Sequence, residues 1–170
     1  MPERADGHPG NRSGRRAGAG WRIFGGSRGL AGELGHFTLY QDGEPCACGK
    51  RGCFECYASA GALVRKAGAR DGRELFGLIR AGNPDASEAL SSWLDDVAAG
   101  ITGLVHIFNP ELVLIGGGIS AQEELLIEPL RQRIMDGVMP RFAEGLAVRR
   151  AVLGNDAGMI GALRFWLDQQ

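Results

Sequence analysis

Four side chains that commonly bind metal ions lie close together in the first third of the chain. His36, Cys46, Cys48 and Cys53 follow the spacing His-x9-Cys-x-Cys-x4-Cys. Zinc prefers thiolate sulfur and imidazole nitrogen in a tetrahedron, and four protein ligands close a structural site. The intervening loop is small, polar and rich in glycine, so a metal ion would hold it folded. The spacing therefore predicts a structural zinc site in a loop spanning residues 36–56.

Other interpretations of these cysteines stay open. All of them could be free thiols in a loop. Cys56 could replace His36 as the fourth ligand, although its place one turn into an expected helix disfavours this. A catalytic zinc would need an open coordination position, which the pattern does not suggest.

Two glutamates flank the cysteine cluster. Rigidly held carboxylates such as Glu33 and Glu55 accept paired hydrogen bonds from neighbouring hydroxyls, as in many sugar sites. Taken alone, each glutamate is more often a solvated side chain or a helix cap. The pair therefore makes a hypothesis about a sugar ligand that needs support from elsewhere in the chain.

A run of three glycines, Gly116, Gly117 and Gly118, follows an expected strand and precedes an expected helix. Such a turn lets a nucleotide approach the backbone. The run matches neither a G-x-G-x-x-G motif nor a Walker loop, so by itself it only suggests a nucleotide.

The elements that must position these residues can be read from hydrophobic periodicity and turn residues. Short strands are expected at 36–40, 111–115 and 146–152, the second of them buried. Helices are expected at 54–67, after a cap at Asp71, at 84–108, after a capping box of Ser120 and Glu123, and at 157–167. The helix after the capping box presents an apolar face made by Leu126, Leu130, Ile134 and Val138. Strands that alternate with helices indicate an α/β protein.

Composition limits the classes of protein that this chain can represent. A length of 170 residues favours one domain or two small lobes, and a net charge of −1 suggests neither a nucleic acid nor another polyanion as partner. Residues 1–20 are rich in glycine and arginine and poor in large apolar side chains, so we expect disorder there. We see no membrane span and no secretory leader, and therefore expect a cytoplasmic protein with reduced thiols.

Four motifs in sequence order resemble the ROK family, which groups sugar kinases with sugar-responsive repressors. GLAGELGH (29–36) and CACGKRGCFECYAS (46–59) are similar to the family signature. NPELVLIGGGIS (109–120) and LGNDAGMIGAL (153–163) are similar to its two later motifs. The resemblance implies an actin-like, ribonuclease-H-like fold of two lobes with a cleft between them. Residues 21–170 would form the second lobe.

The resemblance also implies roles for individual residues. The family's zinc ligands match His36, Cys46, Cys48 and Cys53. The positions that hold sugar hydroxyls match Glu33, His36 and Glu55. His36 would then use one ring nitrogen for zinc and the other for the sugar. The turn beside the adenosine of ATP matches Gly116, Gly117 and Gly118, with magnesium on the phosphates. Family members commonly form dimers or tetramers, so we expect a homo-oligomer.

The sequence departs from the family pattern upstream of residue 25. It has neither the Asp-x-Gly-Gly-Thr phosphate loop nor the Asn-Asp motif that holds the catalytic base. We therefore expect the first lobe to be missing, no catalytic residue here, and no useful phosphotransfer by this chain alone. In the family the last helix packs toward the first lobe. We expect its apolar face to be uncovered here and to cause self-association. That face comprises Ile160, Leu163, Trp166 and Leu167.

Three functional hypotheses follow. The favoured one is the sugar-binding, zinc-bearing lobe of a ROK hexose kinase, similar to glucokinase and truncated at its N-terminus. The second is the effector-binding half of a ROK repressor. The third is a zinc-stabilised interaction module that binds no sugar.

Overall fold

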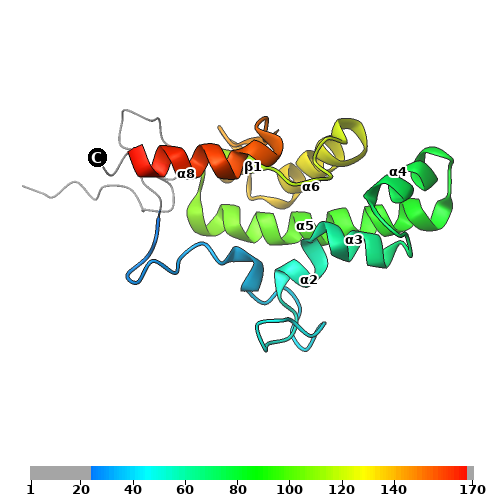
Figure 1. Ribbon diagram of the computed structural model, residues 1–170, viewed down its shortest axis with the longest axis horizontal. Helices are drawn as coiled ribbons and strands as arrows, with labels where there is room; N and C mark the ends of the chain where they lie inside the picture. The colour runs from blue at the N-terminus through cyan, green and yellow to red at the C-terminus, as the bar shows by residue number, and fades with distance from the viewer. Residues whose placement is uncertain (1–23, 168–170) are drawn as a thin grey trace, which may run out of the picture.

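A computed structural model of the chain describes residues 24–167, apart from the side chain of Asn155 (Figure 1). The helices are α2 (Phe54–Ala58), α3 (Ala60–Lys66), α4 (Gly72–Arg80), α5 (Pro84–Phe108), α6 (Glu128–Gly137), α7 (Pro140–Ala143) and α8 (Ala157–Leu167). The strands are β1 (Leu112–Ile115) and β2 (Ala147–Arg150). Short helical turns cover Leu34–His36, Glu123–Ile127 and Gly154–Asp156. The predicted mixture of helices and strands is confirmed, whereas the expected disorder of residues 1–20 falls outside the described residues.

The long helix α5 is the element around which the others are arranged. The Asn83 side chain caps it by accepting a 2.9 Å hydrogen bond from the Ala86 N–H, and Pro84 occupies its first turn. Asn109 ends the helix in the left-handed conformation, with φ of 44°, and Pro110 prevents its continuation. These local residues explain why the sequence predicted the helix bounds 84–108 correctly.

The core lies mainly between α5 and α6. Trp93, Leu94 and Val97 of α5 are buried. The predicted apolar face of the helical segment formed by the turn Glu123–Ile127 and α6 is confirmed, since its four residues are all buried. They are Leu126, Leu130, Ile134 and Val138. Truncation of a fully buried leucine or isoleucine to alanine typically costs about 2–5 kcal/mol. Ile115 and Ile119, on either side of the three glycines, pack against this core and so position the glycine turn.

The two strands form a parallel pair in which Leu112 lies opposite Ala147 and Ile115 opposite Arg150. The connection between them runs through α6 and α7, as parallel strands require a crossover. The prediction that β1 is buried is wrong, because Leu112 is 38% and Leu114 58% exposed. A run of apolar residues indicates that burial of a strand would be favourable. It does not indicate whether another layer of the fold packs over that strand.

Three sequence expectations about the segments around the site need correction. Residues 36–40 form no strand. The turn Leu34–His36 is followed instead by a single antiparallel bridge between Thr38 and Cys53. The segment that contains Cys53 changes direction at Gly52, whose φ is 71°. An added Cβ at Gly52 would overlap the Tyr40 carbonyl oxygen. A longer ladder therefore cannot form.

The expected helix 54–67 is two helices, because Ser59 between them has extended φ and ψ of −70° and 153°. Its hydroxyl accepts a hydrogen bond from Ala62 N, and its carbonyl accepts one of 3.1 Å from the Trp93 indole. The cap and the contact with α5 together stabilise the break.

The expected capping box at Ser120 is also wrong. The Ser120 hydroxyl donates a 2.8 Å hydrogen bond to the Gly117 carbonyl, and the helix begins only at Glu123, in a π-helical turn. Gln122 precedes this turn without a side-chain cap.

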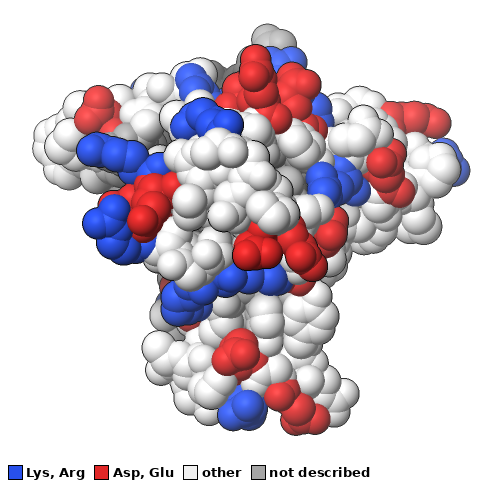
Figure 2. Space-filling view, turned by 90° about the vertical axis from the view of Figure 1, so that its right-hand side faces the viewer, with Lys and Arg blue, Asp and Glu red and all other residues white. Residues whose placement is uncertain are grey.

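Two parts of the molecule stand away from the core. The cysteine loop, which comprises residues 42–53, projects together with α2 below α5, and α8 stands at the end of the molecule opposite α4 (Figure 1). Among the described residues, no helix combines the length and apolarity needed to cross a bilayer. Figure 2 shows Lys and Arg side chains interspersed with Asp and Glu over one face of the molecule.

Candidate functional site

The backbone of the cysteine loop turns tightly enough to bring its thiols together. The Cys46 N–H donates a 2.8 Å hydrogen bond to the Lys50 carbonyl, and the Gly49 N–H returns a 3.0 Å bond to the Cys46 carbonyl. Gly49 has φ of 88°, a conformation that other residues rarely adopt. The glycine after the second cysteine is thus needed for the turn, which places Cys46 and Cys48 on the same side of the loop.

His36, Cys46, Cys48 and Cys53 form one cluster whose potential ligand atoms all lie within 4.8 Å of one another. The Cys46 Sγ atom lies 3.6 Å from His36 Nδ1, and the Cys48 and Cys53 sulfurs also lie 3.6 Å apart. With zinc–sulfur bonds of about 2.3 Å, neighbouring ligands of a tetrahedral ion lie roughly 3.7 Å apart. The spacing of these donors therefore fits a single zinc ion.

The remaining cysteine lies outside this cluster. Cys56 directs its Sγ atom toward the Pro45 carbonyl oxygen at 3.6 Å. Cys56 belongs to α2, which begins directly after Cys53, and its sulfur is not among the four clustered donor atoms. The geometry thus favours His36 over Cys56 as the fourth member.

The environment of the thiols bears on their protonation. A hydrogen bond from the Lys50 backbone N–H, together with the neighbouring Cys46 thiol, lowers the pKa of Cys48 to about 7. A thiolate is the form that binds metal ions. Cys53 has no exposed surface, and its burial raises the pKa of its thiol. The cluster therefore combines one readily ionised thiol with a shielded one.

Two carboxylates approach the same imidazole ring from opposite nitrogens. Glu55 Oε1 lies 3.3 Å from His36 Nδ1, and Glu33 Oε2 lies 3.8 Å from His36 Nε2. Glu55 also accepts a 3.0 Å hydrogen bond from the Cys46 thiol. Glu33 comes from the turn before Leu34–His36 and Glu55 from the first turn of α2. The structure thus brings together the three residues that sequence analysis assigned to a sugar.

Close backbone packing holds this triad. A Cβ atom at Gly35 would lie 3.3 Å from the Glu55 Cβ, tighter than most contacts of this kind. The rings of Phe37 and Phe54, each next in sequence to a cluster member, stack at 4.9 Å. The exposed fractions of the side chains are 78% for Glu33, 31% for His36 and 42% for Glu55, so a solute can reach all three.

The three glycines leave β1 and enter an open turn. Gly117 has φ of 105°, and an added Cβ at Gly117 or Gly118 would meet no atom within 4 Å. One side of the turn faces an apolar cavity of about 340 Å³, to which Phe54 of α2 and Trp93 of α5 contribute. Phe54, which lines this cavity, precedes Glu55 of the triad in sequence, so α2 contributes neighbouring residues to both.

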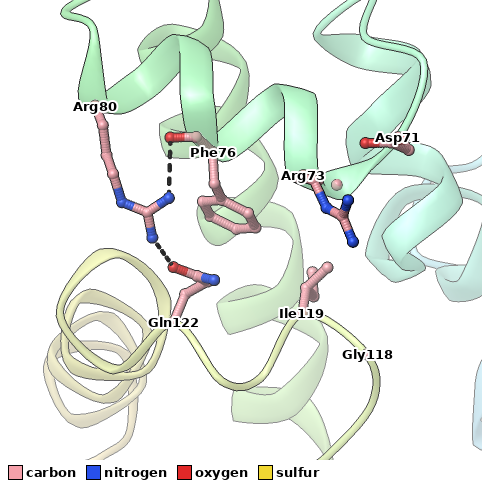
Figure 3. Close-up of a pocket in the computed structure, with 8 residues that line it drawn as sticks. Asp71, Arg73, Phe76, Arg80, Gly118, Ile119 and Gln122 are labelled. Carbon is pink, nitrogen blue, oxygen red and sulfur yellow. Dashed lines mark hydrogen bonds between the residues drawn. The ribbon is translucent and has the colours of Figure 1, made fainter.

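A second cavity, which also borders Gly118, is lined by residues that sequence analysis did not single out (Figure 3). Arg73 and Arg80 of α4 line it together with Gln122. More than 40 residues separate α4 from Gln122 in sequence, as the 42-residue spacing of Arg80 and Gln122 shows. No spacing pattern could have revealed this cavity, since it arises only from the packing of α4 beside the turn.

Comparison with known proteins places this architecture in a family. The sequence profile described as the ROK family matches residues 18–169. A glucokinase of Thermotoga maritima is 38% identical over 156 residues, which cover 81% of this chain and 49% of that protein. A xylose repressor of Bacillus spizizenii is 25% identical over 82% of this chain and 37% of that protein.

Among solved structures, a ROK family glucokinase from Streptomyces griseus in complex with glucose and AMPPNP superposes with a TM-score of 0.76. It is 30% identical, and the match covers 84% of this chain and 53% of that protein. The chain spans about half the length of the glucokinases that it matches. Because the family profile covers nearly the whole sequence and ROK sugar kinases share its fold, this chain belongs to the ROK family.

Proposed function

We propose that this chain forms the sugar-binding and zinc-bearing half of a ROK-family hexose kinase related to glucokinases. The observation that carries the proposal is the convergence of Glu33 and Glu55 on the two ring nitrogens of His36. The Nδ1 side of the imidazole faces the Cys46 thiol and Glu55, and the Nε2 side faces the exposed carboxylate of Glu33. A ring placed in this way can join a metal site to a ligand site.

The sugar would be bound through hydroxyl groups. Carboxylates of Glu33 and Glu55 accept hydrogen bonds from neighbouring hydroxyls, and hydrogen bonds to a charged group are each worth about 1.5–3 kcal/mol. A related glucokinase, 30% identical, was solved with glucose bound. A hexose such as glucose is therefore the ligand that we expect at this triad.

Zinc would act as a structural ion held by His36, Cys46, Cys48 and Cys53. The donor set of three sulfurs and one imidazole nitrogen suits zinc, and four ligands leave no open position for catalysis. His36 would bind through Nδ1, the nitrogen that lies 3.6 Å from Cys46 Sγ. Nε2 would then carry the proton and donate toward Glu33 or a sugar oxygen. The loop that positions Glu55 would thereby become rigid.

A nucleotide would lie against Gly116, Gly117 and Gly118. The open space around Gly117 and Gly118 admits close approach of a ligand to the backbone. The relative solved with glucose also contains AMPPNP, an ATP analogue. ATP with magnesium is therefore the phosphoryl donor that we assign to the intact kinase. We assign no catalytic base to this chain, and we expect no phosphotransfer when the 170-residue chain is assayed alone.

We further infer a homo-oligomer in a reducing compartment, the cytoplasm. The exposed apolar side chains of α8 support association. A reducing compartment would keep the thiols of Cys46, Cys48, Cys53 and Cys56 available to a metal ion.

The effector-binding half of a ROK repressor is the second candidate. The likeness to xylose repressors and to a ROK transcriptional regulator, 27% identical with a TM-score of 0.65, favours it. A repressor half would bind a sugar at the same triad without needing ATP at the glycine turn. Binding of ATP by the zinc-loaded chain would therefore favour the kinase.

Hexose binding is the direct test of the proposal. We would measure the thermal unfolding of the zinc-loaded chain with and without glucose, then repeat it with Glu33→Gln and Glu55→Gln. Each variant should weaken binding at least tenfold, because one charged acceptor becomes an amide. Glu88→Gln is the matched control, since Glu88 is an exposed residue of α5 whose side chain makes no hydrogen bond or salt bridge within the described part of the chain.

Each result of this experiment has a fixed meaning. Stabilisation by glucose that both site variants lose and Glu88→Gln retains supports the proposal. A zinc-loaded chain that no hexose or pentose stabilises would overturn it and leave the third hypothesis, a zinc-stabilised interaction module. Stabilisation that Glu33→Gln and Glu55→Gln leave intact would place the sugar elsewhere.

A further inference from the structure

A cavity of about 560 Å³ lies where the cysteine loop meets α2, α3 and α5. Its volume is within the range of about 300–1,000 Å³ usual for small-molecule sites. None of the residues assigned above to zinc, the sugar or the nucleotide lines it. Its polar lining converges from separate elements, as in many ligand sites, and consists of Glu44, Tyr57, Arg65, Lys66 and Asp96.

Two of the charged groups in this lining neutralise each other. Asp96 accepts a 3.3 Å hydrogen bond from the Lys66 ammonium through Oδ2 and a 2.6 Å bond from the Tyr40 hydroxyl through Oδ1. Both carboxylate oxygens are therefore engaged. The Lys66–Asp96 pair makes a neutral wall, so the charges that select a ligand are those of Glu44 and Arg65.

Glu44 and Tyr57 form the wall on the side of the cysteine loop. The Glu44 N–H donates a 2.6 Å hydrogen bond to the Tyr57 hydroxyl oxygen. The Tyr57 ring packs edge-on against Tyr40, with 4.8 Å between the ring centroids, so its position is fixed. Within the described residues, the Tyr57 hydroxyl donates to no acceptor, and the exposed Glu44 carboxylate makes no hydrogen bond or salt bridge. A donor and a negative charge are thus available to a solute.

Arg65 supplies the opposite charge from α3. It is exposed, and within the described residues its guanidinium makes only one long contact, of 3.5 Å, from Nη2 to the Cys56 carbonyl. Because Cys56 precedes Tyr57, the guanidinium lies beside the backbone of Tyr57, whereas Glu44 lies beside the hydroxyl of the same side chain. The positive and negative groups are therefore separated by about the length of a tyrosine side chain.

We propose that this cavity binds a small zwitterion, a molecule with one carboxylate and one ammonium group, such as an amino acid. The planar guanidinium of Arg65 matches the paired oxygens of a carboxylate, and the Tyr57 hydroxyl adds a donor. The Glu44 carboxylate accepts from the ammonium group. A simple anion would leave Glu44 without a partner, and a simple cation would leave Arg65 without one, so the site selects molecules that carry both charges.

A bound zwitterion would connect two parts of the molecule. Glu44 belongs to the cysteine loop, whereas Arg65 belongs to α3, which packs against α5. A ligand that contacts both residues binds only the folded arrangement and therefore stabilises it. The proposal uses no residue of the sugar, zinc or nucleotide sites, so it does not rest on the proposed kinase function.

The experiment uses the full 170-residue zinc-loaded chain and probes that differ in charge. γ-Aminobutyrate carries both charges, butyrate only the negative one and butylammonium only the positive one. L-Alanine carries both charges at a shorter spacing. Binding is measured by NMR titration of the isotopically labelled chain. We expect at least one of the two zwitterions to bind, and butyrate and butylammonium to bind at least tenfold more weakly than it does.

Variants locate the bound probe. Glu44→Gln and Arg65→Gln should each weaken binding of the zwitterion roughly tenfold, because each removes one charge. Glu88→Gln and Arg141→Gln are the matched controls and should leave binding unchanged. Both are exposed residues outside the cavity lining, on α5 and α7. A cooperative thermal unfolding transition shows that each variant is folded.

Each outcome bears on the proposal. Zwitterion binding that both site variants weaken and both controls retain supports it, and the tighter of the two zwitterions indicates the preferred charge spacing. Absence of binding by both zwitterions overturns it, as does equally tight binding of butyrate or butylammonium. Loss of binding in only one site variant, or equal loss in the controls, also overturns it. Because no variant alters Glu33, His36 or Glu55, a failure of glucose binding leaves this test intact.

Discussion

Tyr40, two residues before the cysteine loop, is joined to Asp96 of the long helix α5 by a hydrogen bond of 2.6 Å from its hydroxyl to Asp96 Oδ1. The two residues lie 56 positions apart in sequence. Asp96 is 8% exposed and also accepts a 3.3 Å bond from the Lys66 ammonium. The loop that carries the thiols is thus anchored to α5 by a nearly buried carboxylate whose two oxygens are both engaged.

The Tyr40–Asp96 bond predicts an effect on stability. Tyr40→Phe should lower the free energy of unfolding by about 1 kcal/mol, because it leaves a nearly buried carboxylate oxygen without its donor. A double-mutant cycle with Asp96→Asn, measured by urea denaturation, should give a coupling energy of similar size. Additive effects of the two substitutions would contradict the assignment.

The same bond predicts a dependence on pH. The hydrogen bond to Asp96 is the main cause, and burial the second, that raises the pKa of Tyr40 from its ordinary value of 10.0 to about 12. Because the folded state raises this pKa, the stability it contributes is complete below pH 10 and is lost as the pH rises through about 12. Absorbance titration at alkaline pH should show a tyrosinate transition near pH 12 that Tyr40→Phe removes. An identical titration of the two proteins would contradict the prediction.

Metal content should separate Cys46 from Cys56. The purified wild-type chain should contain about one zinc per chain under reducing conditions, and Cys46→Ser should lose it. Cys56→Ser is the control and should keep its zinc, because Cys56 faces the Pro45 carbonyl. Elemental analysis by mass spectrometry measures both. Loss of zinc from Cys56→Ser would revive the alternative ligand set, and a wild type without zinc would overturn the metal site.

Two glycines of α5 should respond in opposite ways to alanine. A Cβ at Gly100 would overlap the Phe54 ring of α2, so Gly100→Ala should destabilise the chain by about 1–3 kcal/mol. Gly103 has no atom within 4 Å of an added Cβ, and Gly103→Ala should stabilise by about 0.5–1 kcal/mol. Urea denaturation of the two variants is the measurement. Similar changes in both would show that α2 does not pack on Gly100.

The last helix should drive self-association. In α8 Leu163 is 59% and Trp166 58% exposed, and both belong to an apolar face that no other described element covers extensively. Leu163→Lys should therefore lower the apparent mass in light scattering. Ile107→Lys serves as the comparison, since Ile107 is 69% exposed on α5 outside this helix. A wild-type chain that remains monomeric at high concentration would count against the prediction.

Most of the elements could be predicted from local sequence. The helix at 84–108 is bounded by residues that act on their nearest neighbours, Asn83 at one end and Asn109-Pro110 at the other. The break at Ser59 was missed, because the Trp93 indole that bonds its carbonyl lies 34 residues away. The exposure of Leu112 and Leu114 in β1 was not predicted for a similar reason, because burial of a strand depends on which helices pack against it in the folded chain.

The sequence by itself predicted which four side chains lie together and pointed to the family, because both depend on spacings of a few residues and on motifs in fixed order. Only the tertiary structure decided that Cys56 lies outside the cluster, that Tyr40 reaches Asp96, and that Arg80 bonds Gln122 beside the glycine turn. The physical reason is that these contacts join segments whose distance in space is set by packing of the helices on one another. A local pattern carries no information about that distance.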